Sequence, residues 1–266
     1  LFSNHDGSSG VGLSILPNAA AAFTAGVTNF THQYEVPNSG ASFGHWPSIA
    51  IDSNDIVYLT WDTSTGGSTA LNNAIMLTTF DLKHPGNGFS APITITHPGV
   101  SVLWPWVAAA NGNAAVVWYQ YDSVTDPDQN TTGNVRLYEA SVFGAAGNTA
   151  VLEGPVDAVG SVIHTGGICQ SGTTCVATGQ DRRLGDFFTD SLDSNGCVLI
   201  ASGETTTDSQ AATSRPMFLQ QTGGSSLTGQ QCTTPLAANT PETPTVPLLI
   251  ACLLYTSPSP RDRQKS

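Results

Sequence analysis

The stretch HWPSIAIDSNDIVYLTW, residues 45–61, predicts a β-hairpin and thereby the fold class. An apolar run enters a turn of Asp, Ser and Asn, and a second run rich in β-branched and aromatic residues leaves it. Asp and Asn tolerate the left-handed backbone angles of tight turns, so we expect two antiparallel strands joined near residues 52–55.

Two further stretches are variants of this unit. LWPWVAAANGNAAVVWY, residues 103–119, aligns with it without a gap. LGDFFTDSLDSNGCVLIAS, residues 184–202, has its own turn, in which Asp193 matches Asp52. Further strand-like runs follow the hairpins, such as AIMLTTF after the first and NVRLYEASVF after the second. Four strands per unit, repeated about every 40 to 50 residues, are typical of β-propeller blades.

The sequence therefore predicts an all-β chain that forms a β-propeller of four-stranded blades. The roughly 250 residues up to Ala251 supply about five blades at about 40 to 50 residues each, and the propeller is expected to be incomplete. We place the propeller domain at residues 1–230, with blade-like units near residues 41–95, 99–150 and 180–225.

Both ends of the chain differ from the repeat. Residues 231–251 are rich in Thr and Pro, which predicts a stalk or linker. Residues 252–262, CLLYTSPSPRD, resemble a translated sequencing adapter, so residues 252–266 are expected to be a non-native scar. The chain starts without Met and without an apolar signal core, which indicates a fragment that lacks its signal peptide.

Charge and cysteines limit the compartment and the partners. The formal net charge is −12, and such a surface repels phosphate groups, so neither nucleic acid nor an anionic membrane is an expected partner. Cys169 and Cys175 flank a turn-forming loop that a disulfide can close, which leaves Cys197 and Cys232 to pair. The rival zinc site lacks a CxxC pair. Disulfides predict an extracellular or cell-surface protein, and we expect a monomer without membrane insertion.

The run TTFDLKHPGNGFSAPITIT, residues 78–96, resembles the bacterial neuraminidase repeat, or Asp box, of sialidases. The repeat reads Ser/Thr, any, Asp, any, Gly, any, any, Trp/Phe. Thr79, Asp81, Gly86 and Phe89 occupy these places, with three extra residues between Asp81 and Gly86. The resemblance extends over most of residues 41–220 and includes secreted sialidase-like proteins of unassigned activity. It implies a sialidase-like propeller in which the box is a structural turn between the third and fourth strands of a blade.

Sialidase chemistry needs three arginines around the sugar carboxylate, a Tyr activated by a Glu, and an Asp that acts as the acid. The Arg, Ile, Pro motif that opens the family is absent. We therefore expect a glycan-binding or structural surface module. The alternative is a sialidase-type exoglycosidase whose N-terminal arginine motif is missing. The arginines before the scar are Arg136, Arg182, Arg183 and Arg215.

The hexapeptide DRRLGD, residues 181–186, is the first candidate binding site. It precedes a predicted inner strand, and strand alternation predicts that Arg182 and Arg183 point to opposite faces. Either one arginine binds an anionic group at the mouth of the channel, or both pair with Asp181, Asp186 or a neighbouring blade and brace the junction.

Tryptophans and oxygen ligands supply the other candidates. Trp46, Trp104 and Trp106 are predicted to begin the inner strands, where such rings either stack on sugars or fill the space between blades. Arg136 is a further candidate ligand-binding residue. Alternating oxygen ligands at Asp126, Asp128 and Asn130 are compatible with Ca²⁺, but Leu137 stands where an EF-type loop needs Glu. A solvated turn is the preferred interpretation there, and no other cofactor is expected.

Overall fold

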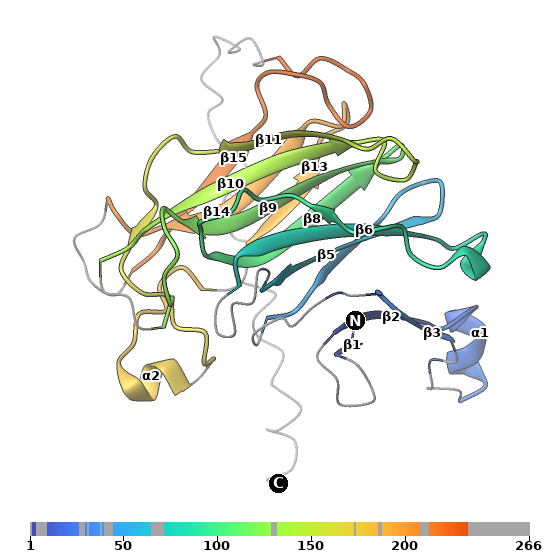
Figure 1. Ribbon diagram of the computed structural model, residues 1–266, viewed down its shortest axis with the longest axis horizontal. Coiled ribbons are helices and arrows are strands. Elements are labelled where there is room, and N and C mark those ends of the chain that lie inside the picture. The colour runs from blue at the N-terminus through green and yellow to red at the C-terminus, as the bar shows by residue number, and fades with distance from the viewer. Residues whose placement is uncertain are drawn as a thin grey trace, which may run out of the picture. The chain divides into compact units, whose positions relative to one another are not determined.

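The structure is a computed structural model that describes residues 2–3, 10–26, 30, 32–37, 39, 45–64, 72–128, 132–172, 174–185, 188–207 and 213–233 (Figure 1). The chain divides into two units, residues 1–233 and residues 234–266, and every described residue belongs to the first. The predicted scar and most of the predicted stalk lie outside the described residues. The division into domains stays a prediction.

The all-β prediction is confirmed, because the described residues form four small antiparallel sheets that resemble propeller blades. We name the sheets A to D in chain order. Their strands are β1 (Phe2–Ser3), β2 (Val11–Ile15) and β3 (His32–Glu35) in sheet A; β4 (Ser48–Ile51), β5 (Ile56–Thr63), β6 (Ala74–Asp81) and β7 (Ile93–Thr94) in sheet B; β8 (Val102–Ala110), β9 (Asn113–Tyr121), β10 (Asn134–Phe143), β11 (Val151–Asp157) and β12 (His164–Thr165) in sheet C; and β13 (Thr189–Leu192), β14 (Val198–Glu204) and β15 (Arg215–Gln220) in sheet D.

The three predicted hairpins open sheets B, C and D, since β4 pairs with β5, β8 with β9, and β13 with β14. The Asp52 carboxylate explains the first turn, because its Oδ1 accepts hydrogen bonds from the amides of Asn54 at 2.9 Å and Ile56 at 3.2 Å. Asp193 accepts the equivalent bonds from Asn195 at 2.8 Å and Cys197 at 3.0 Å. The two turns thus share one local chemistry.

The Asp-box run lies between the third and fourth strands of sheet B, as the resemblance implies. Strand β6 ends at Asp81, a 3₁₀ turn η1 (Pro85–Asn87) follows, and Phe80 forms a bridge with Phe89 before β7 begins. Asp81 holds this turn, because its Oδ1 accepts the Lys83 amide at 2.7 Å.

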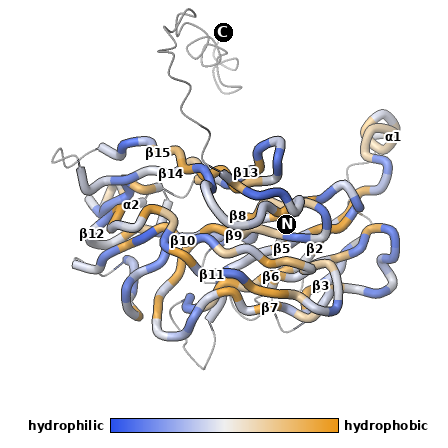
Figure 2. The backbone as a smooth tube through the Cα atoms, turned by 90° about the horizontal axis from the view of Figure 1, so that it is seen from above, coloured by the Kyte–Doolittle hydropathy of each residue, from blue (hydrophilic) through white to orange (hydrophobic). Residues whose placement is uncertain are grey.

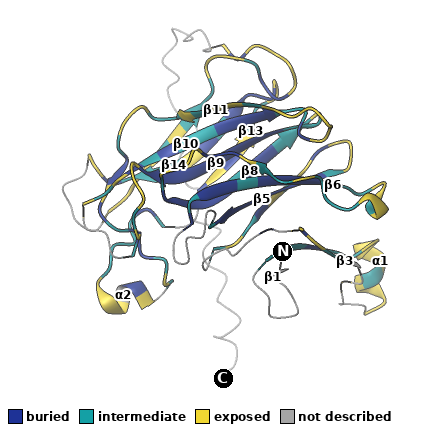
Figure 3. Ribbon diagram, viewed as in Figure 1, coloured by how far each residue is buried: buried dark blue, intermediate teal, exposed yellow. Residues whose placement is uncertain are grey.

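Each sheet packs on the next through an apolar interface. Val11 of sheet A and Val36, directly after β3, form a cluster with Leu59 and Trp61 of sheet B. Strands β4, β5 and β6 contact β8 of sheet C. Sheets C and D share a cluster that includes Val117 and Ile200. Figure 3 shows the buried residues concentrated in β5, β8, β9 and β10.

Helix contributes little, as predicted. Among the described residues there are two short helices, α1 (Ala19–Thr24) and α2 (Thr174–Thr178). Helix α1 is hydrophobic in Figure 2 but buries no residue, and Phe23 is 64% exposed. No helix in the described part of the chain is long and apolar enough to span a membrane.

Candidate functional site

A row of aromatic rings runs between sheets C and D at the start of their first strands. Trp104 lies edge-on to Tyr119 at 6.3 Å between ring centroids, and Tyr119 contacts Phe188 at 4.3 Å. Phe188 in turn lies edge-on to Trp106 at 6.4 Å. The Tyr119 hydroxyl shares a hydrogen bond of 2.9 Å with Ser202 Oγ, and burial raises the pKa of Tyr119 to about 12. The phenol is therefore a neutral member of the row.

A β-bulge aims Trp106 at sheet D. Leu103 pairs with Tyr119, but the next pair is Trp106 with Val117, so β8 carries one extra residue here. Trp104 takes a left-handed φ of 52° within the bulge, and its amide donates to Asp62 Oδ2 at 3.2 Å. Without the extra residue, alternation would turn Trp106 toward sheet B. Bulges commonly redirect a side chain in this way.

The aromatic pocket, as we name it, lies beside Trp106 and has a volume of about 350 Å³. It is apolar apart from two hydroxyl groups and contains no charged side chain. The Trp106 indole N–H is buried and has no hydrogen-bond partner among the described residues. An unpaired buried donor is destabilising by about 1 to 3 kcal/mol, so an acceptor brought near it would be favoured. The lining residues are Trp106, Phe188, Thr189, Ala201, Ser202, Pro216 and Met217.

A second pocket of about 270 Å³, the polar pocket, lies between sheet D and the segment after β11. Glu204 and Arg215 face each other across β14 and β15, with Arg215 Nε 3.9 Å from Glu204 Oε1. The amides of Thr206 and Thr207 donate to Glu204 Oε2 at 3.0 and 3.1 Å. Hydrogen bonds from Thr207 are the main reason why the pKa of Glu204 lies below its usual value, so this residue is an anion.

A third cavity, the outer cavity, has a volume of about 220 Å³ and is lined by Glu139 of β10 and Leu219 of β15. Burial raises the pKa of Glu139 to about 7 although Ser141 donates to it. Asp190 of β13 is buried, neither of its carboxyl oxygens has a hydrogen-bond partner among the described residues, and burial raises its pKa well above the usual value. Burial thus favours the protonated form of both carboxyl groups, for Glu139 at pH values below about 7.

A polar chain joins sheet B to the disulfide loop. His45 contacts Asp62 through Nδ1 and Gln170 through Nε2, and the Gln170 amide donates to Asp128 Oδ1 at 2.8 Å. Burial disfavours the His45 imidazolium, but the Asp62 carboxylate and both hydrogen bonds outweigh it, so the pKa of His45 is raised. Both ring nitrogens of His45 have hydrogen-bond partners, so this residue links sheet B to the disulfide loop and is not available as a general base.

The structure corrects the interpretation of DRRLGD. Strand β13 begins only at Thr189, and Gly185 N donates to Arg182 O at 3.1 Å, so the arginines lie in a bend and strand alternation does not apply. Arg183 forms a bidentate pair with Asp181, including Nη2 to Oδ2 at 2.6 Å, which raises the pKa of Arg183. Arg182 donates to Cys169 O at 2.7 Å. Arg183 thus pairs within the hexapeptide, whereas Arg182 binds the disulfide loop. Asp186 lies outside the described residues.

The structure separates the other predicted site residues. Trp104 is 2% exposed and packs in the core, whereas Trp46 precedes β4 and is 42% exposed. Arg136 on β10 pairs with Asp122 at 3.0 Å and Asp157 at 2.8 Å. None of these residues lines the aromatic pocket beside Trp106.

The predicted calcium loop is only partly described, because Asn130 lies outside the described residues. Asp126 Oδ1 accepts the Asp128 amide at 2.9 Å, and Asp128 binds Gln170. No group of three or more His, Cys, Asp or Glu suited to a metal ion occurs among the described residues. The calcium site stays a prediction.

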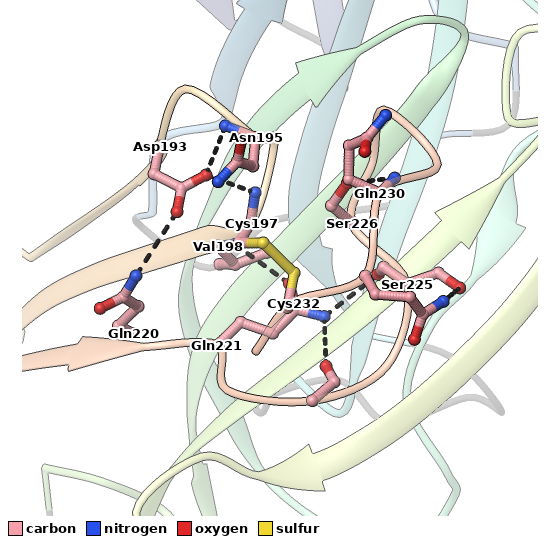
Figure 4. The surroundings of a disulfide bond; sticks show 12 residues. Asp193, Asn195, Cys197, Val198, Gln220, Gln221, Ser225, Ser226, Gln230 and Cys232 are labelled. Carbon is pink, nitrogen blue, oxygen red and sulfur yellow. Dashed lines mark hydrogen bonds between the residues drawn. A yellow bond between two sulfur atoms is a disulfide. The ribbon is translucent and has the colours of Figure 1, made fainter. Parts of the chain in front are cut away.

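Both predicted disulfides are confirmed, Cys169–Cys175 and Cys197–Cys232. Figure 4 shows Cys197, at the start of β14, joined to Cys232 beside the Asp193 turn. The segment closed by this bond places Leu227 in the cluster between sheets C and D. Two disulfides are typical of proteins in oxidising compartments.

Sequence reasoning missed the aromatic pocket as a site. It singled out Trp106 only as one of three repeated tryptophans and gave no role to Phe188, Ser202 or Met217. The signal was present in the unusual run WPW, residues 104–106, but the bulge that directs the second ring is visible only in the structure.

The sequence matches no protein-family model and no curated protein. Among solved structures, the chain is similar to an ulvan lyase of polysaccharide lyase family PL25, with 13% identity over 76% of this chain and 47% of that chain and a TM-score of 0.43. It is similar to an exo-1,5-α-L-arabinanase from a bovine ruminal metagenomic library, with 9% identity, coverage of 79% and 64%, and a TM-score of 0.34.

A third similar structure is a GH43 endo-arabinanase from Bacillus licheniformis, with 13% identity over 76% of this chain and 62% of that chain and a TM-score of 0.33. The chain spans less than two thirds of each of these three proteins. The similarities are distant, and the resemblance to sialidases stays a prediction.

Proposed function

We propose that this chain is an extracellular glycan-binding module and that a sugar ring binds in the aromatic pocket between sheets C and D. The observation that carries the proposal is this pocket, which combines an aromatic wall with hydroxyl groups. Its volume of about 350 Å³ falls within the range of about 300 to 1,000 Å³ that is usual for small-molecule sites.

The lining of the pocket suits a pyranose ring. The C–H face of such a ring is apolar and packs on aromatic side chains, for which Trp106 and Phe188 are available. Its hydroxyl groups need partners, and the oxygens of Thr189 and Ser202, which line the pocket, have acceptor capacity beyond their bonds to Asp190 and Tyr119.

The second candidate function, a sialidase-type exoglycosidase, gains less support. Its carboxylate site requires three arginines around one ligand, but Arg136, Arg183 and Arg215 each have different acidic partners. Tyr138 stacks on Trp118 within the interface toward sheet B, while the adjacent Glu139 faces sheet D. A Tyr activated by that Glu is therefore disfavoured.

The proposal is tested with the complete chain on a glycan array, with the Trp106→Ala variant measured alongside. We expect a defined set of glycans to bind wild-type protein and an affinity loss of about tenfold or more in the variant, which is usual for a buried aromatic anchor. The matched control is Trp46→Ala, which removes an exposed tryptophan outside the pocket.

Equal loss in both tryptophan variants would contradict the assignment to this pocket, and absence of all glycan binding would contradict the function. Hydrolysis of a fluorogenic sialoside by the wild-type chain would favour the exoglycosidase instead.

A further inference from the structure

The aromatic pocket and the polar pocket meet at two residues. Pro216 and Met217 of β15 line both, with Trp106 in the lining of the first pocket and Arg215 in that of the second. Met217 lies opposite Ser202 in the sheet, and Arg215 lies opposite Glu204, which places the two pockets in succession along the same pair of strands. A ligand longer than one ring could therefore contact both.

The polar pocket offers hydrogen-bond donors, and the charges of its Arg215 and Glu204 side chains cancel. The Arg215 side chain is 61% exposed, and Nη1 donates to Thr207 Oγ1 at 2.9 Å, whereas Glu204 is 14% exposed. The Glu204 carboxylate faces Arg215 and already accepts several bonds from Thr206 and Thr207. The remaining guanidinium N–H groups can donate in a planar fork to the hydroxyl oxygens of a neighbouring sugar.

The charge of the two pockets and of the whole chain favours neutral glycans over acidic ones. The lining of the aromatic pocket contains no ionisable group, and Glu204 offsets the charge of Arg215. The formal net charge of the chain, −12, raises the energy of any anionic ligand further. A sugar carboxylate or sulfate would thus find no uncompensated cation in either pocket.

We propose that the two pockets form one extended site for a neutral oligosaccharide of at least two sugar units, with one ring against Trp106 and the next beside Arg215. This inference rests on the proposed function, because it specifies the ligand of the same site. It differs from the sialidase alternative, which requires an anionic sugar.

The test is isothermal titration calorimetry of the complete chain with defined probes. The neutral probes are the hexasaccharides of cellulose, xylan, mannan and starch, each paired with its methyl monosaccharide glycoside; hexagalacturonic acid and sialyllactose are the acidic probes. We expect at least one neutral hexasaccharide to bind about tenfold tighter than its methyl glycoside, and the acidic probes to bind more weakly than it does.

Variants separate the two pockets. Arg215→Ala should weaken the hexasaccharide about tenfold, as loss of hydrogen bonds from a charged donor usually does, and leave the methyl glycoside unchanged. Trp106→Ala should weaken both. Arg136→Ala, which removes another paired arginine that lies in neither pocket, should change neither affinity. Arg215 is exposed, so its substitution is not expected to disturb folding.

Different results overturn different claims. Equal affinity for the hexasaccharide and the methyl glycoside, both weakened by Trp106→Ala, would overturn the extended site and leave the proposed function standing. Tighter binding of an acidic probe, or hexasaccharide binding that Arg215→Ala leaves unchanged, would also overturn it. No binding of any probe would overturn both the extended site and the glycan-binding function.

Discussion

The two faces of sheet C differ in how completely they are filled. Toward sheet B, Trp118 is fully buried, stacks on Tyr138 at 5.9 Å and donates its indole N–H to Gln120 at 3.0 Å. Toward sheet D, the Trp106 N–H and the Asp190 carboxyl have no partners among the described residues. The aromatic pocket, the polar pocket and the outer cavity all lie on this second side.

A single strand supplies both interfaces. In β9, Trp118 belongs to the cluster toward sheet B, whereas Val117 and Tyr119 belong to the cluster toward sheet D. The difference teaches that blade packing and ligand binding can be assigned to opposite faces of one sheet. Substitutions toward sheet B should act on stability, and substitutions in the aromatic and polar pockets should act chiefly on binding.

The largest effect is expected from Trp118→Ala, which removes the bulkiest buried ring on the side of sheet B. Large-to-small substitutions of buried aromatic residues destabilise by about 3 to 5 kcal/mol. The free energy of unfolding from urea titration measures this loss. Phe218→Ala is the control, since Phe218 is 67% exposed and should change stability little. A loss below about 1 kcal/mol for Trp118→Ala would mean that this interface is not tightly packed.

Loss of the Cys197–Cys232 disulfide should destabilise the packing between sheets C and D, to which the closed segment contributes Leu227. This bond closes a sequence separation of 35 residues, against 6 for Cys169–Cys175. On the chain-entropy relation, the long loop contributes about 4 kcal/mol and the short loop about 2. Paired Cys→Ser variants compared by thermal unfolding should give the larger fall in Tm for the long loop. The reverse order would show that the segment containing Leu227 does not depend on its crosslink.

The Glu139→Gln variant tests whether the buried carboxyl groups toward sheet D make stability depend on pH. Folding raises the pKa of Glu139 to about 7, so the folded state binds more protons than the unfolded state at pH values between the ordinary pKa of Glu and about 7. Stability should therefore fall as pH rises through this window. The substitution should remove about 3 kcal/mol of that fall, because each unit of pKa shift corresponds to about 1.4 kcal/mol.

Urea unfolding at a series of pH values measures the effect of Glu139→Gln. Asp190→Asn should change the pH dependence in the same direction, because burial raises that pKa as well. Glu35→Gln on β3, whose residue is exposed, is the matched control. A pH profile identical in wild type and Glu139→Gln would contradict the buried, protonated state of this carboxyl group.

The smallest expected change in stability comes from substitutions in the two equivalent turns, at Asp52 and Asp193. Besides its own turn, Asp52 accepts the Gly112 amide at 2.9 Å and the Tyr58 hydroxyl at 3.0 Å, and the first of these bonds joins sheet B to sheet C. Asp52→Ala should therefore cost about 2 kcal/mol. Asp193→Ala should lower Tm less, because its bonds remain within sheet D. Equal shifts in Tm would mean that the bond to Gly112 contributes nothing.

The sequence predicted what local chemistry determines. Asp52 and Asp193 accept hydrogen bonds from amides two and four residues further along, so the turn residues alone specify the hairpins. The disulfides were predictable because the short Cys169 to Cys175 loop restricts the pairing. Both features depend on few residues that are close in sequence.

Features that depend on distant residues were not predictable. Alternation along β8 turns Trp106 toward sheet B unless the bulge is known, and its pocket is completed by Met217 from a different sheet. Strand alternation does not extend to Arg182 and Arg183, because the bend after Arg182 delays β13 to Thr189. The candidate site is therefore a product of how sheets C and D meet.

The central claim is that the side of sheet C toward sheet D holds a sugar at Trp106. A crystal structure of the chain soaked with the neutral hexasaccharide that binds best tests it most directly. We predict one sugar ring against Trp106 and Phe188 and the next ring beside Arg215. Sugar bound instead at the exposed Trp46, or in the outer cavity at Glu139 with the aromatic pocket unoccupied, would contradict the claim.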